Sequence, residues 1–351
     1  MPQDWILVTG SNGLVGSAVS RLAIERGYGV IGLDNNGRRE FFGHAGDTTR
    51  MGALLRTTYG PSYCEIDFDV SNSITGPVKH AADKRQVVGI VHAAGQPSHD
   101  LAKQMIERDL EVNLLGTLNM LKLNREHFGS VPFVFLSTNK VYGAQPNALR
   151  LRELSTRFDF DNEDFDGIDE TMSLDQTDHS FFGVSKAAAD LLVQEFGRSF
   201  DMPTACLRCG CITGGDHAGV ELHGFLNYLI GCGLADRPYK IFGYQGKQVR
   251  DNIHADDLAN LILAIIKQPT KAAVYNVGGG RANSCSILEA AALFEEIAKY
   301  PLRLKVEPTA RFGDHIVYYT DLKKVRTQYP EWRIRRTLRD IFGEMILNHR
   351  R

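Results

Sequence analysis

Three glycines with regular spacing near the N-terminus are the first residues whose arrangement indicates chemistry. Gly10, Gly13 and Gly16 follow a short apolar run over residues 5–9 and precede a helical pattern over residues 17–26. In a strand–turn–helix unit, glycines at these places permit a tight turn, leave room for phosphate against backbone N–H groups and let the helix pack closely on the strand. The helix N-terminus adds a partial positive charge. The segment therefore predicts a loop that binds the pyrophosphate of a dinucleotide.

A carboxylate stands at the end of the second expected strand, residues 29–33. There Asp34 can accept hydrogen bonds from the hydroxyls of the adenosine ribose, and its charge would repel a 2′-phosphate. This position favours NAD over NADP, and we prefer it to an ordinary carboxylate in a surface turn. Arg38 and Arg39 favour the opposite choice, because an arginine near the ribose accommodates the 2′-phosphate of NADP.

Two more expected strands bring further residues to the same edge of a sheet. Residues 62–68 end at Asp69 and Val70, and residues 87–91 end at His92, which is followed by three small residues. Strands that alternate with helices predict a parallel sheet, and ligands bind at the carboxyl ends of its strands. We expect Asp69 and Val70 beside the adenine and the small residues against the cofactor. We interpret His92 as a packed histidine at a strand end.

Composition narrows the class of protein. The chain has 351 residues with 43% hydrophobic and 23% charged residues, as is ordinary for a globular protein. Its net charge of -2 disfavours binding to nucleic acid through phosphate neutralisation. The apolar stretches are shorter than the roughly 20 residues that cross a bilayer, and the N-terminus lacks the pattern of a secretory signal. We therefore expect a cytoplasmic protein with no membrane or nucleic-acid partner.

Three of the six cysteines lie close together in the sequence, as metal ligands often do. Cys206, Cys209 and Cys211 are not followed by a second pair of cysteine or histidine at a suitable distance for zinc. We interpret them as reduced thiols at the end of a strand, in keeping with a reducing compartment. No metal site is predicted.

A second group of chemically capable residues follows a fifth expected strand, residues 133–136. The segment Ser137-Thr-Asn-Lys-Val-Tyr-Gly143 ends that strand, and Phe181-Phe-Gly-Val-Ser-Lys186 enters a later helix. With the glycine loop and with the segments at residues 250–257, 275–279 and 311–314, the chain resembles the extended short-chain dehydrogenase/reductase family of sugar-nucleotide epimerases and dehydratases. Within that family, residues 34–49, 137–143 and 246–251 resemble CDP-tyvelose (CDP-paratose) 2-epimerases.

The resemblance implies an α/β protein, with a Rossmann fold built on a doubly wound parallel sheet and a smaller C-terminal substrate lobe. It implies an NAD-binding domain at residues 1–205 and about 240–277, and a substrate lobe at residues 206–239 and 278–351. It also implies NAD as the cofactor, a nucleotide sugar as the substrate and a homodimer as the assembly.

Site residues follow from the same resemblance. Lys186 is expected to hold the nicotinamide ribose, and Thr138 to hydrogen-bond to the reacting oxygen. Guanidinium groups suit a diphosphate because they donate paired hydrogen bonds. The expected catalytic residues are Thr138, Lys140 and Lys186, and the expected substrate-binding residues are Asn139, His179, Arg250 and Arg311. The expected cofactor-binding residues are Gly10, Asn12, Gly13, Leu14, Val15, Gly16, Asp34, Asn35, Arg38, Asp69, Val70, Ala93, Ala94, Gly95, Gln96, Asn113 and Lys186.

One position departs from the family pattern. The family carries Tyr-x-x-x-Lys, in which the lysine lowers the pKa of a tyrosine that exchanges a proton with the sugar hydroxyl as hydride moves. In this chain Phe182 stands at the tyrosine position, four residues before Lys186. A positioned acid–base group contributes roughly 100- to 10,000-fold to a rate. Another residue must therefore take the role in an active enzyme, and the candidates are Lys140, Tyr142 and His179.

Three functions remain open at this point. We favour NAD-dependent epimerisation of a nucleotide-activated sugar through a transient keto-sugar. A dehydratase shares the first step and then eliminates water. A catalytically silent protein that binds NAD and a sugar nucleotide is compatible with Phe182.

Two charged segments have ordinary interpretations. Residues 144–179 form a long insert with an acidic tract at residues 159–169, which predicts a solvated loop or, alternatively, a lid over the sugar. The basic run at residues 333–339 is expected on the exposed face of the final helix.

Overall fold

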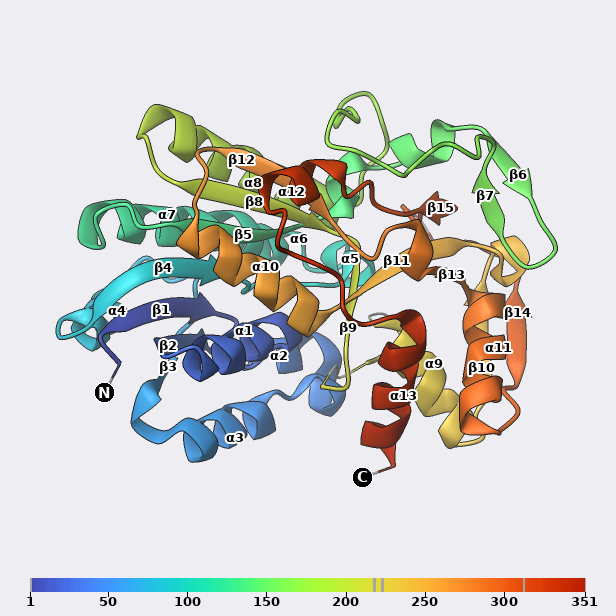
Figure 1. The fold of residues 1–351 in the computed structure, drawn as a ribbon, viewed down its shortest axis with the longest axis horizontal. Coiled ribbons are helices and arrows are strands. Elements are labelled where there is room, and N and C mark those ends of the chain that lie inside the picture. The colour runs from blue at the N-terminus through green and yellow to red at the C-terminus, as the bar shows by residue number, and fades with distance from the viewer. Residues whose placement is uncertain (1, 217–218, 222–223, 312, 351) are drawn as a thin grey trace. The chain divides into compact units, whose positions relative to one another are not determined.

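The computed structural model describes residues 2–216, 219–221, 224–311 and 313–350, and the chain divides into two compact units (Figure 1). The first unit takes in residues 1–138, 181–208 and 258–275, and the second takes in residues 139–180, 209–257 and 276–351. The division differs from the predicted domains at residues 139–180 and 240–257, which belong to the second unit. The reason lies in strand pairing, because β11 (Val249–His254) hydrogen-bonds to β9, β13 and β15 of that unit.

Within the described residues, the first unit is built on a seven-stranded sheet with the order β12-β8-β5-β4-β1-β2-β3. Its strands are β1 (Asp4–Thr9), β2 (Gly29–Asp34), β3 (Tyr63–Asp67), β4 (Gln86–His92), β5 (Phe133–Thr138), β8 (Thr204–Cys209) and β12 (Ala273–Val277). β1 pairs in parallel with β2 and β4, β2 with β3, and β4 with β5. The predicted doubly wound parallel sheet is confirmed.

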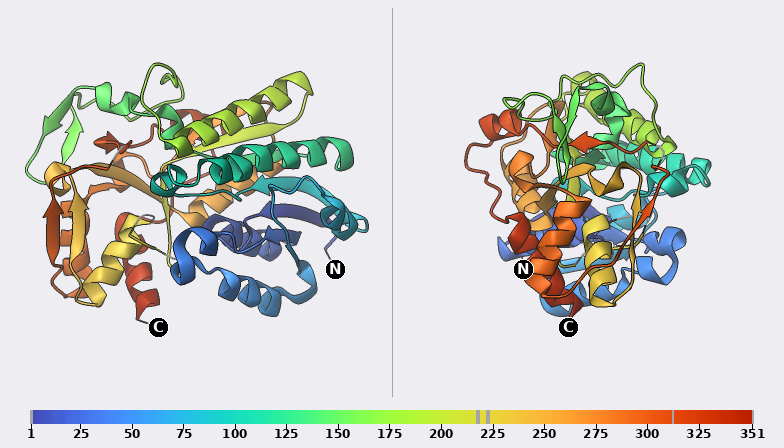
Figure 2. Two further views of the ribbon diagram at one scale, coloured as in Figure 1. Left: turned by 180° about the vertical axis from the view of Figure 1, so that it is seen from behind. Right: turned by 90° about the vertical axis from the view of Figure 1, so that its right-hand side faces the viewer.

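Helices cover both faces of this sheet. They are α1 (Leu14–Glu25), α2 (Arg38–Phe42), α3 (Thr49–Tyr59), α4 (Gly76–Ala82), α5 (His99–Ala102), α6 (Ile106–Leu110), the π-helical turn η3 (Glu111–Leu115), α7 (Gly116–His127), α8 (Phe181–Ser199) and α10 (Ala255–Lys267), with the short 3₁₀ turns η1 (Gly43–Gly46) and η2 (Gly60–Ser62). α1 and α10 lie in front of the sheet in Figure 1, and α7 and α8 lie in front in the left view of Figure 2.

The core of the first unit explains why its strands are apolar along their whole length. Leu7, Ile90 and Phe135 of the central strands pack with Met120 of α7 and Val193 of α8, and all five are fully buried. Strands that are covered on both faces read as continuous apolar runs. Their polar residues therefore gather at the carboxyl ends, which neighbouring parallel strands bring to one edge of the sheet.

A buried ion pair fastens α8 to the sheet. Asp190 of α8 is fully buried, and its carboxylate accepts hydrogen bonds from the Ser137 hydroxyl of β5 at 2.6 Å and from Arg208 Nη2 of β8 at 2.9 Å. Gln194, one turn further along α8, also donates to this carboxylate. Lys186 lies one turn before Asp190 on the same helix, so the ion pair fixes the position of Lys186 against β5.

The second unit has smaller sheets and its own core. Its strands are β6 (Leu151–Glu153), β7 (Phe158–Phe160), β9 (Cys211–Thr213), β10 (Tyr239–Phe242), β11 (Val249–His254), β13 (Ser284–Ser286), β14 (Leu304–Glu307) and β15 (Val317–Tyr318). Its helices and 3₁₀ turns are η4 (Asn139–Tyr142), η5 (Gln145–Ala148), α9 (Phe225–Leu234), η6 (Tyr244–Gly246), η7 (Arg281–Asn283), α11 (Ile287–Ala298), α12 (Lys323–Gln328) and α13 (Leu338–His349). α9, α11 and α13 enclose an apolar cluster that includes Leu229, Phe294 and Phe342.

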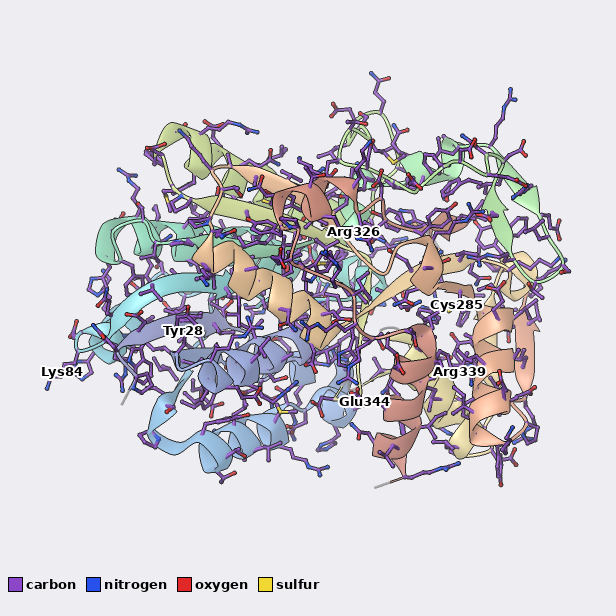
Figure 3. The ribbon with its side chains drawn as sticks, viewed as in Figure 1. Tyr28, Lys84, Cys285, Arg326, Arg339 and Glu344 are labelled. Atoms are coloured by element: carbon purple, nitrogen blue, oxygen red, sulfur yellow. The ribbon has the colours of Figure 1, made fainter. Side chains whose placement is uncertain are left out.

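Capping boxes start two of these helices. The Ser286 and Thr337 hydroxyls accept from backbone N–H groups in the first turns of α11 and α13. In turn, the Glu289 and Asp340 carboxylates accept from the backbone N–H groups of Ser286 and Thr337. Glu344 lies further along α13 (Figure 3). Its carboxylate accepts from the backbone N–H of Gly215 and from His254 Nε2. This His254 bond lowers the pKa of the Glu344 carboxyl to about 2.

Two interpretations of charged segments need correction. The acidic tract is not uniformly solvated, because Asp159 in the middle of β7 is buried and binds Arg281 at 2.9 Å. Most of the basic run precedes the final helix, which begins at Leu338, although Arg339 at its end lies on that helix and is exposed. The backbone N–H groups of Arg335 and Arg336 in that run instead donate to the Asp257 carboxylate. Through the described ranges, no helix combines the length and apolarity that crossing a membrane requires.

The buried ion pair gives a test of stability. Replacing Arg208 with leucine leaves the Asp190 carboxylate buried without its counter-charge, so we expect the free energy of unfolding to fall by about 3–5 kcal/mol. Arg303→Leu breaks an ion pair to Asp236 whose partners are 58% and 67% exposed, and it should cost no more than about 1 kcal/mol. Urea unfolding of both variants measures the difference. Equal losses would contradict the role given to the Arg208 pair.

Candidate active site

The glycine loop joins β1 to α1 in the way that phosphate binding requires. Gly10 has a φ of +65°, and a Cβ there would lie 2.9 Å from the backbone nitrogen of Ala94. A Cβ at Gly16 would overlap the carbonyl of Gly10, and one at Gly13 would lie 3.3 Å from that same oxygen. The three glycines therefore keep side chains out of a cradle that is lined by backbone.

The start of α1 supplies the groups that bind an anion. The helix begins at Leu14, and its first-turn N–H groups have no partner within the helix. Gly13 precedes it as the N-cap residue and brings no side chain to accept from these groups. Leu14 and Val15 can thus offer their amides to a pyrophosphate, and the helix dipole adds to the attraction. The residues present fit the phosphates of NAD.

Asp34 lies at the carboxyl end of β2, next to this loop. Its carboxylate accepts from the backbone N–H groups of Asn12 at 2.9 Å and Asn36 at 2.8 Å. Burial raises the pKa of Asp34, while these two hydrogen bonds act in the opposite direction. The bonds leave each carboxylate oxygen a further acceptor site, so Asp34 is able to take the ribose hydroxyls.

The two neighbouring arginines differ in their surroundings. Arg39 is paired with Asp47 at 3.2 Å. Arg38 lies 4.8 Å from the centre of the Phe42 ring, and burial lowers the pKa of its guanidinium to about 10. Asn35 is exposed, and its side chain accepts from the Gly37 amide. Of these residues, Arg38 is the partly buried cation nearest in the sequence to Asp34.

At the end of β3, Asp69 has a partner that the sequence did not indicate. Arg108 Nη2 donates to Asp69 Oδ2 at 2.6 Å, and the Ser71 hydroxyl donates to Oδ1 at 2.7 Å. Burial acts to raise the pKa of Asp69, but these hydrogen bonds bring it below its ordinary value. Val70 is buried, and its carbonyl accepts from Asn119.

The loop after β4 is held by a buried amide network. The Thr9 hydroxyl accepts from the Ala94 amide at 3.0 Å, and Asn113 Oδ1 accepts from the Gln96 amide at 3.0 Å. Asn113 lies in the π-helical turn and also donates to Asp109 and to the Ser185 hydroxyl. A π-helical turn of this kind is frequent at functional sites. The network fixes the small residues Ala93–Gly95 while leaving Gly95 exposed.

Lys186 points into the same region from α8. Its ammonium donates to the Leu136 carbonyl at 2.6 Å and lies 4.2 Å from the centre of the Phe135 ring. A Cβ at Gly95 would be 3.7 Å from the Lys186 nitrogen, so Lys186 lies beside the exposed backbone of the β4 loop. Thr138 is two residues after Leu136 on β5. Lys186 and the β4 loop thus meet at the carboxyl edge of the sheet.

Neither His92 nor Phe182 is suited to exchange a proton with a substrate near neutral pH. His92 is fully buried between the Thr9 and Thr117 hydroxyls, and burial lowers the pKa of its imidazole to about 3. These contacts support the interpretation of a packed histidine. Phe182 is 8% exposed on the helix face that carries Lys186 and has no ionisable group. The first unit therefore places an inert ring where the family has a phenol.

In the second unit, two expected site residues share one carboxylate. Lys140 Nζ donates to Asp314 Oδ1 at 3.2 Å and to the Gly313 carbonyl at 3.0 Å. Arg250 Nη2 donates to the same oxygen of Asp314 at 2.5 Å. Burial lowers the pKa of Lys140, and Asp314 acts against this shift. Lys140, Asp314 and Arg250 thus form a compact charged cluster.

The other two candidates for the missing acid–base group are held differently. Tyr142 is fully buried and its hydroxyl donates to Asn276 at 2.7 Å, which suits an anchor for the turn η4. His179 donates through Nε2 to the Leu174 carbonyl, and its Nδ1 is buried. A Cβ at Gly143 would lie 3.0 Å from His179, so this ring packs against the end of η4. Among the three candidates, only Lys140 is joined to a second cation through a shared carboxylate.

Arg311 lies next to that cluster, because its backbone carbonyl accepts from the Asp314 N–H at 3.4 Å. Its guanidinium donates to the Glu221 carbonyl at 2.9 Å and lies 4.4 Å from the centre of the Phe242 ring. Asn139 is buried at the start of η4. Phe312, between Arg311 and Gly313 in the predicted motif, lies outside the described residues.

The three neighbouring cysteines lie on two strands. Cys206 and Cys209 belong to β8 and Cys211 begins β9, and none of the three forms a disulfide. Burial raises the pKa of Cys211 to about 12. Across the part of the chain that the structure describes, no three metal-ligating side chains lie close enough together to hold an ion.

The sequence missed several residues that position the site. Asp190 was detectable in principle, because it stands four residues after Lys186 on the same helix face. Asp314 lies within a motif that was recognised, but its partners were not. Arg108 and Asp109 carried no signal, because their contacts join segments that are distant in the sequence.

Comparisons with known proteins agree with the resemblance seen in the motifs. Residues 6–278 match the sequence profile of the NAD dependent epimerase/dehydratase family. CDP-paratose 2-epimerase of Salmonella typhi is 29% identical over 341 residues, covering 93% of this chain and 94% of that protein. dTDP-glucose 4,6-dehydratase of Neisseria meningitidis is 26% identical over 329 residues, covering 90% and 82%.

Solved structures share the fold. UDP-glucuronic acid 4-epimerase of Bacillus cereus, solved with UDP-glucuronic acid and NAD, superposes with a TM-score of 0.79 over 99% of both chains at 20% identity. dTDP-glucose 4,6-dehydratase of Bacillus anthracis, solved with NAD, gives a TM-score of 0.76 over 99% of this chain and 96% of that one at 18% identity.

The contacts of Asp34 predict the choice of cofactor. Asp34→Asn keeps the size of the side chain and removes its charge, so it should lose most of the preference for NAD over NADP. Fluorescence titration of the purified protein with both dinucleotides measures the ratio of dissociation constants. Asp83→Asn, which removes the same charge from an exposed position after α4, is the matched control. Tighter binding of NADP by the parent protein would instead favour an assignment to Arg38.

The position of Lys186 predicts its effect on binding and on hydride transfer. Lys186→Met preserves the buried stem but removes the ammonium, so NAD should bind more weakly and any hydride transfer should be lost. Lys122→Met, on the exposed side of α7, serves as the control. Binding and turnover are followed by calorimetry and by nicotinamide absorbance. Unchanged values for Lys186→Met would mean that this side chain does not reach the cofactor.

Proposed function

Because the chain belongs to the NAD-dependent epimerase/dehydratase family, we propose that it inverts one carbon of a nucleotide-activated sugar through a transient keto-sugar. The observation that carries this proposal is the combination of a glycine cradle, Asp34 and Lys186 on one sheet edge with the charged cluster of Lys140 and Arg250. The 29% identity to a CDP-paratose 2-epimerase supports epimerisation and makes CDP-sugars the first substrates to test.

The first unit would hold the cofactor. The amides of the α1 N-terminus bind the pyrophosphate, Asp34 binds the adenosine ribose, and Lys186 binds the nicotinamide ribose. When bound, NAD supplies a hydride acceptor that later returns the hydride, so the overall reaction involves no net oxidation.

The sugar hydroxyl must lose a proton as its carbon loses hydride. Thr138 would hydrogen-bond to the reacting oxygen, and the neutral Lys140 amine would take the proton, because Phe182 is unable to do so. Burial lowers the pKa of Lys140, which enlarges the neutral fraction of the amine at a given pH. The same ammonium would return the proton when hydride is returned.

Inversion follows from the carbonyl of the keto-sugar. The carbonyl either lets hydride return to the opposite face of the ring or acidifies a neighbouring C–H bond. Arg250 and Arg311 would hold the diphosphate while the sugar reorients, since their guanidinium groups suit its oxygens. The sugar therefore stays attached through its nucleotide during both half-reactions.

Two alternatives are each favoured by a particular observation. The 26% identity to a dTDP-glucose 4,6-dehydratase favours elimination of water after the same first step. Phe182 favours a silent protein that binds NAD and a sugar nucleotide. Incubation with CDP-, UDP-, GDP- and dTDP-sugars, followed by mass spectrometry and chromatography, separates the three. An epimer keeps the mass of its substrate, a dehydratase product is lighter by one water, and a silent protein changes nothing.

The assignment of proton transfer predicts a set of variants. Lys140→Met and Thr138→Val should each lower turnover at least ~100-fold, whereas Lys305→Met, on an exposed lysine of the second unit, should not. Because only the neutral amine accepts a proton, turnover of the parent should rise with pH until Lys140 is deprotonated. Activity that survives both site variants would place the acid–base group elsewhere.

The phenylalanine itself gives a complementary prediction. If Lys140 carries the proton, the parent protein should react without a phenol at position 182. The hydroxyl that Phe182→Tyr adds would need a hydrogen-bond partner in a buried position. If the parent protein is silent, this is the substitution that should create activity with a sugar nucleotide. Turnover of the parent and of Phe182→Tyr with the same panel of sugars decides between these cases.

A further inference from the structure

The charged cluster of the second unit has one carboxylate for two cations. Asp314 Oδ1 accepts from Arg250 Nη2 at 2.5 Å and from Lys140 Nζ at 3.2 Å. The side chains are 11%, 15% and 21% exposed for Arg250, Lys140 and Asp314, so water screens these contacts poorly. Because Arg250 and Lys140 share one carboxylate oxygen, each is bound less strongly than it would be by a separate anion.

We propose that Asp314 binds Arg250 in the free protein where a phosphate of the substrate would otherwise bind. When the diphosphate of the substrate binds, Arg250 leaves Asp314 and pairs with the diphosphate. Asp314 then pairs with Lys140 alone. The proposal rests on the proposed function, since it takes Arg250 as a diphosphate ligand and Lys140 as the proton carrier. A diphosphate offers oxygens with more charge than one carboxylate, and a guanidinium binds two of them at once.

The exchange changes the basicity of Lys140. In the free protein, burial lowers the pKa of the Lys140 ammonium, Asp314 raises it and Arg250 lowers it further. A diphosphate neutralises Arg250 and returns the whole carboxylate to Lys140, so both changes raise this pKa. The Lys140 ammonium therefore keeps its proton to a higher pH once the diphosphate is in place, and the neutral amine forms at a higher pH than in the free protein.

The other groups around Lys140 do not oppose this direction. His315 and Cys211 are two further titratable groups that interact with Lys140. His315 is fully buried and donates through Nε2 to the Gly143 carbonyl, and burial holds the pKa of its imidazole well below the usual range. Burial also raises the pKa of the Cys211 thiol to about 12. Both stay neutral over the ordinary pH range, so the carboxylate and the guanidinium control Lys140.

The consequence is a link between diphosphate binding and the protonation of Lys140. Without a diphosphate, Arg250 stays on Asp314 and the pKa of Lys140 stays lower. Linkage is reciprocal, so a ligand that raises the pKa of Lys140 binds more tightly to the protonated form. Diphosphate binding should therefore take up protons and weaken as pH rises through the pKa of Lys140 in the free protein.

Calorimetry with inorganic pyrophosphate tests the exchange in the full chain. Asp314→Asn removes the competing anion from Arg250, so pyrophosphate should bind about tenfold more tightly than to the parent. Asp236→Asn removes the same charge from an exposed pair with Arg303 and should leave the affinity unchanged. Equal or weaker binding by a folded Asp314→Asn protein would overturn the proposal, as would an absence of pyrophosphate binding to the parent.

A second measurement reads Lys140 directly. After reductive ¹³C-methylation, the Lys140 resonance is identified by its loss in Lys140→Met, and its titration is followed by NMR. Pyrophosphate should move the midpoint upward in the parent, and Arg250→Met should move it upward without any ligand. A midpoint unchanged in both cases would overturn the proposal even if Asp314→Asn fails to fold.

The outcomes separate this inference from the proposed function. If pyrophosphate gives both expected results but no nucleoside diphosphate binds and no nucleotide sugar reacts, the carboxylate exchange holds and the proposed function fails. If nucleotide sugars react while Asp314→Asn binds pyrophosphate no better than the parent, the proposed function holds and the exchange fails.

Discussion

The carboxylate of Asp190 is the constraint on which the first unit depends. It is fully buried, and it joins α8 to β5 through Ser137 and to β8 through Arg208. A buried carboxylate without these partners would carry a large desolvation cost, so the three elements have only one favourable arrangement. That arrangement places Lys186, one turn earlier on α8, against the Leu136 carbonyl. The rigidity of the candidate site therefore originates in an ion pair that takes no part in the chemistry.

In the proposed reaction, the first unit would bind the cofactor and the second unit would bind the substrate. The first unit offers backbone amides, small residues and a single carboxylate, which suit a cofactor that must be held in one orientation. The second unit offers a partly buried cluster of Lys140, Arg250 and Asp314, whose partners can be exchanged for a charged ligand. A fixed cofactor site and an exchangeable substrate site suit a reaction in which the sugar must be presented by two faces.

Phe182 changes which groups are able to carry a proton. Its ring is 8% exposed on α8, four residues before Lys186, and it lacks the hydroxyl of the family tyrosine. Tyr142 and His179 are held by hydrogen bonds to Asn276 and to the Leu174 carbonyl, whereas Lys140 takes part in a charged cluster. Under the proposed function, the proton-transfer role shifts to Lys140, whose basicity depends on neighbouring charges.

The sequence by itself determined the parallel sheet, the glycine loop and the positions of Asp34 and Lys186, because each depends on local spacing along one strand–turn–helix unit. It also identified Lys140 and Arg250 through motifs. It did not determine that Asp190 binds Arg208, that Asp69 binds Arg108 or that Asp314 joins Lys140 to Arg250. Nor did it show that Asp159 in the acidic tract is buried against Arg281. Only the tertiary structure decided these pairs, because they join segments far apart in the chain, and which charges meet depends on how the strands and helices pack.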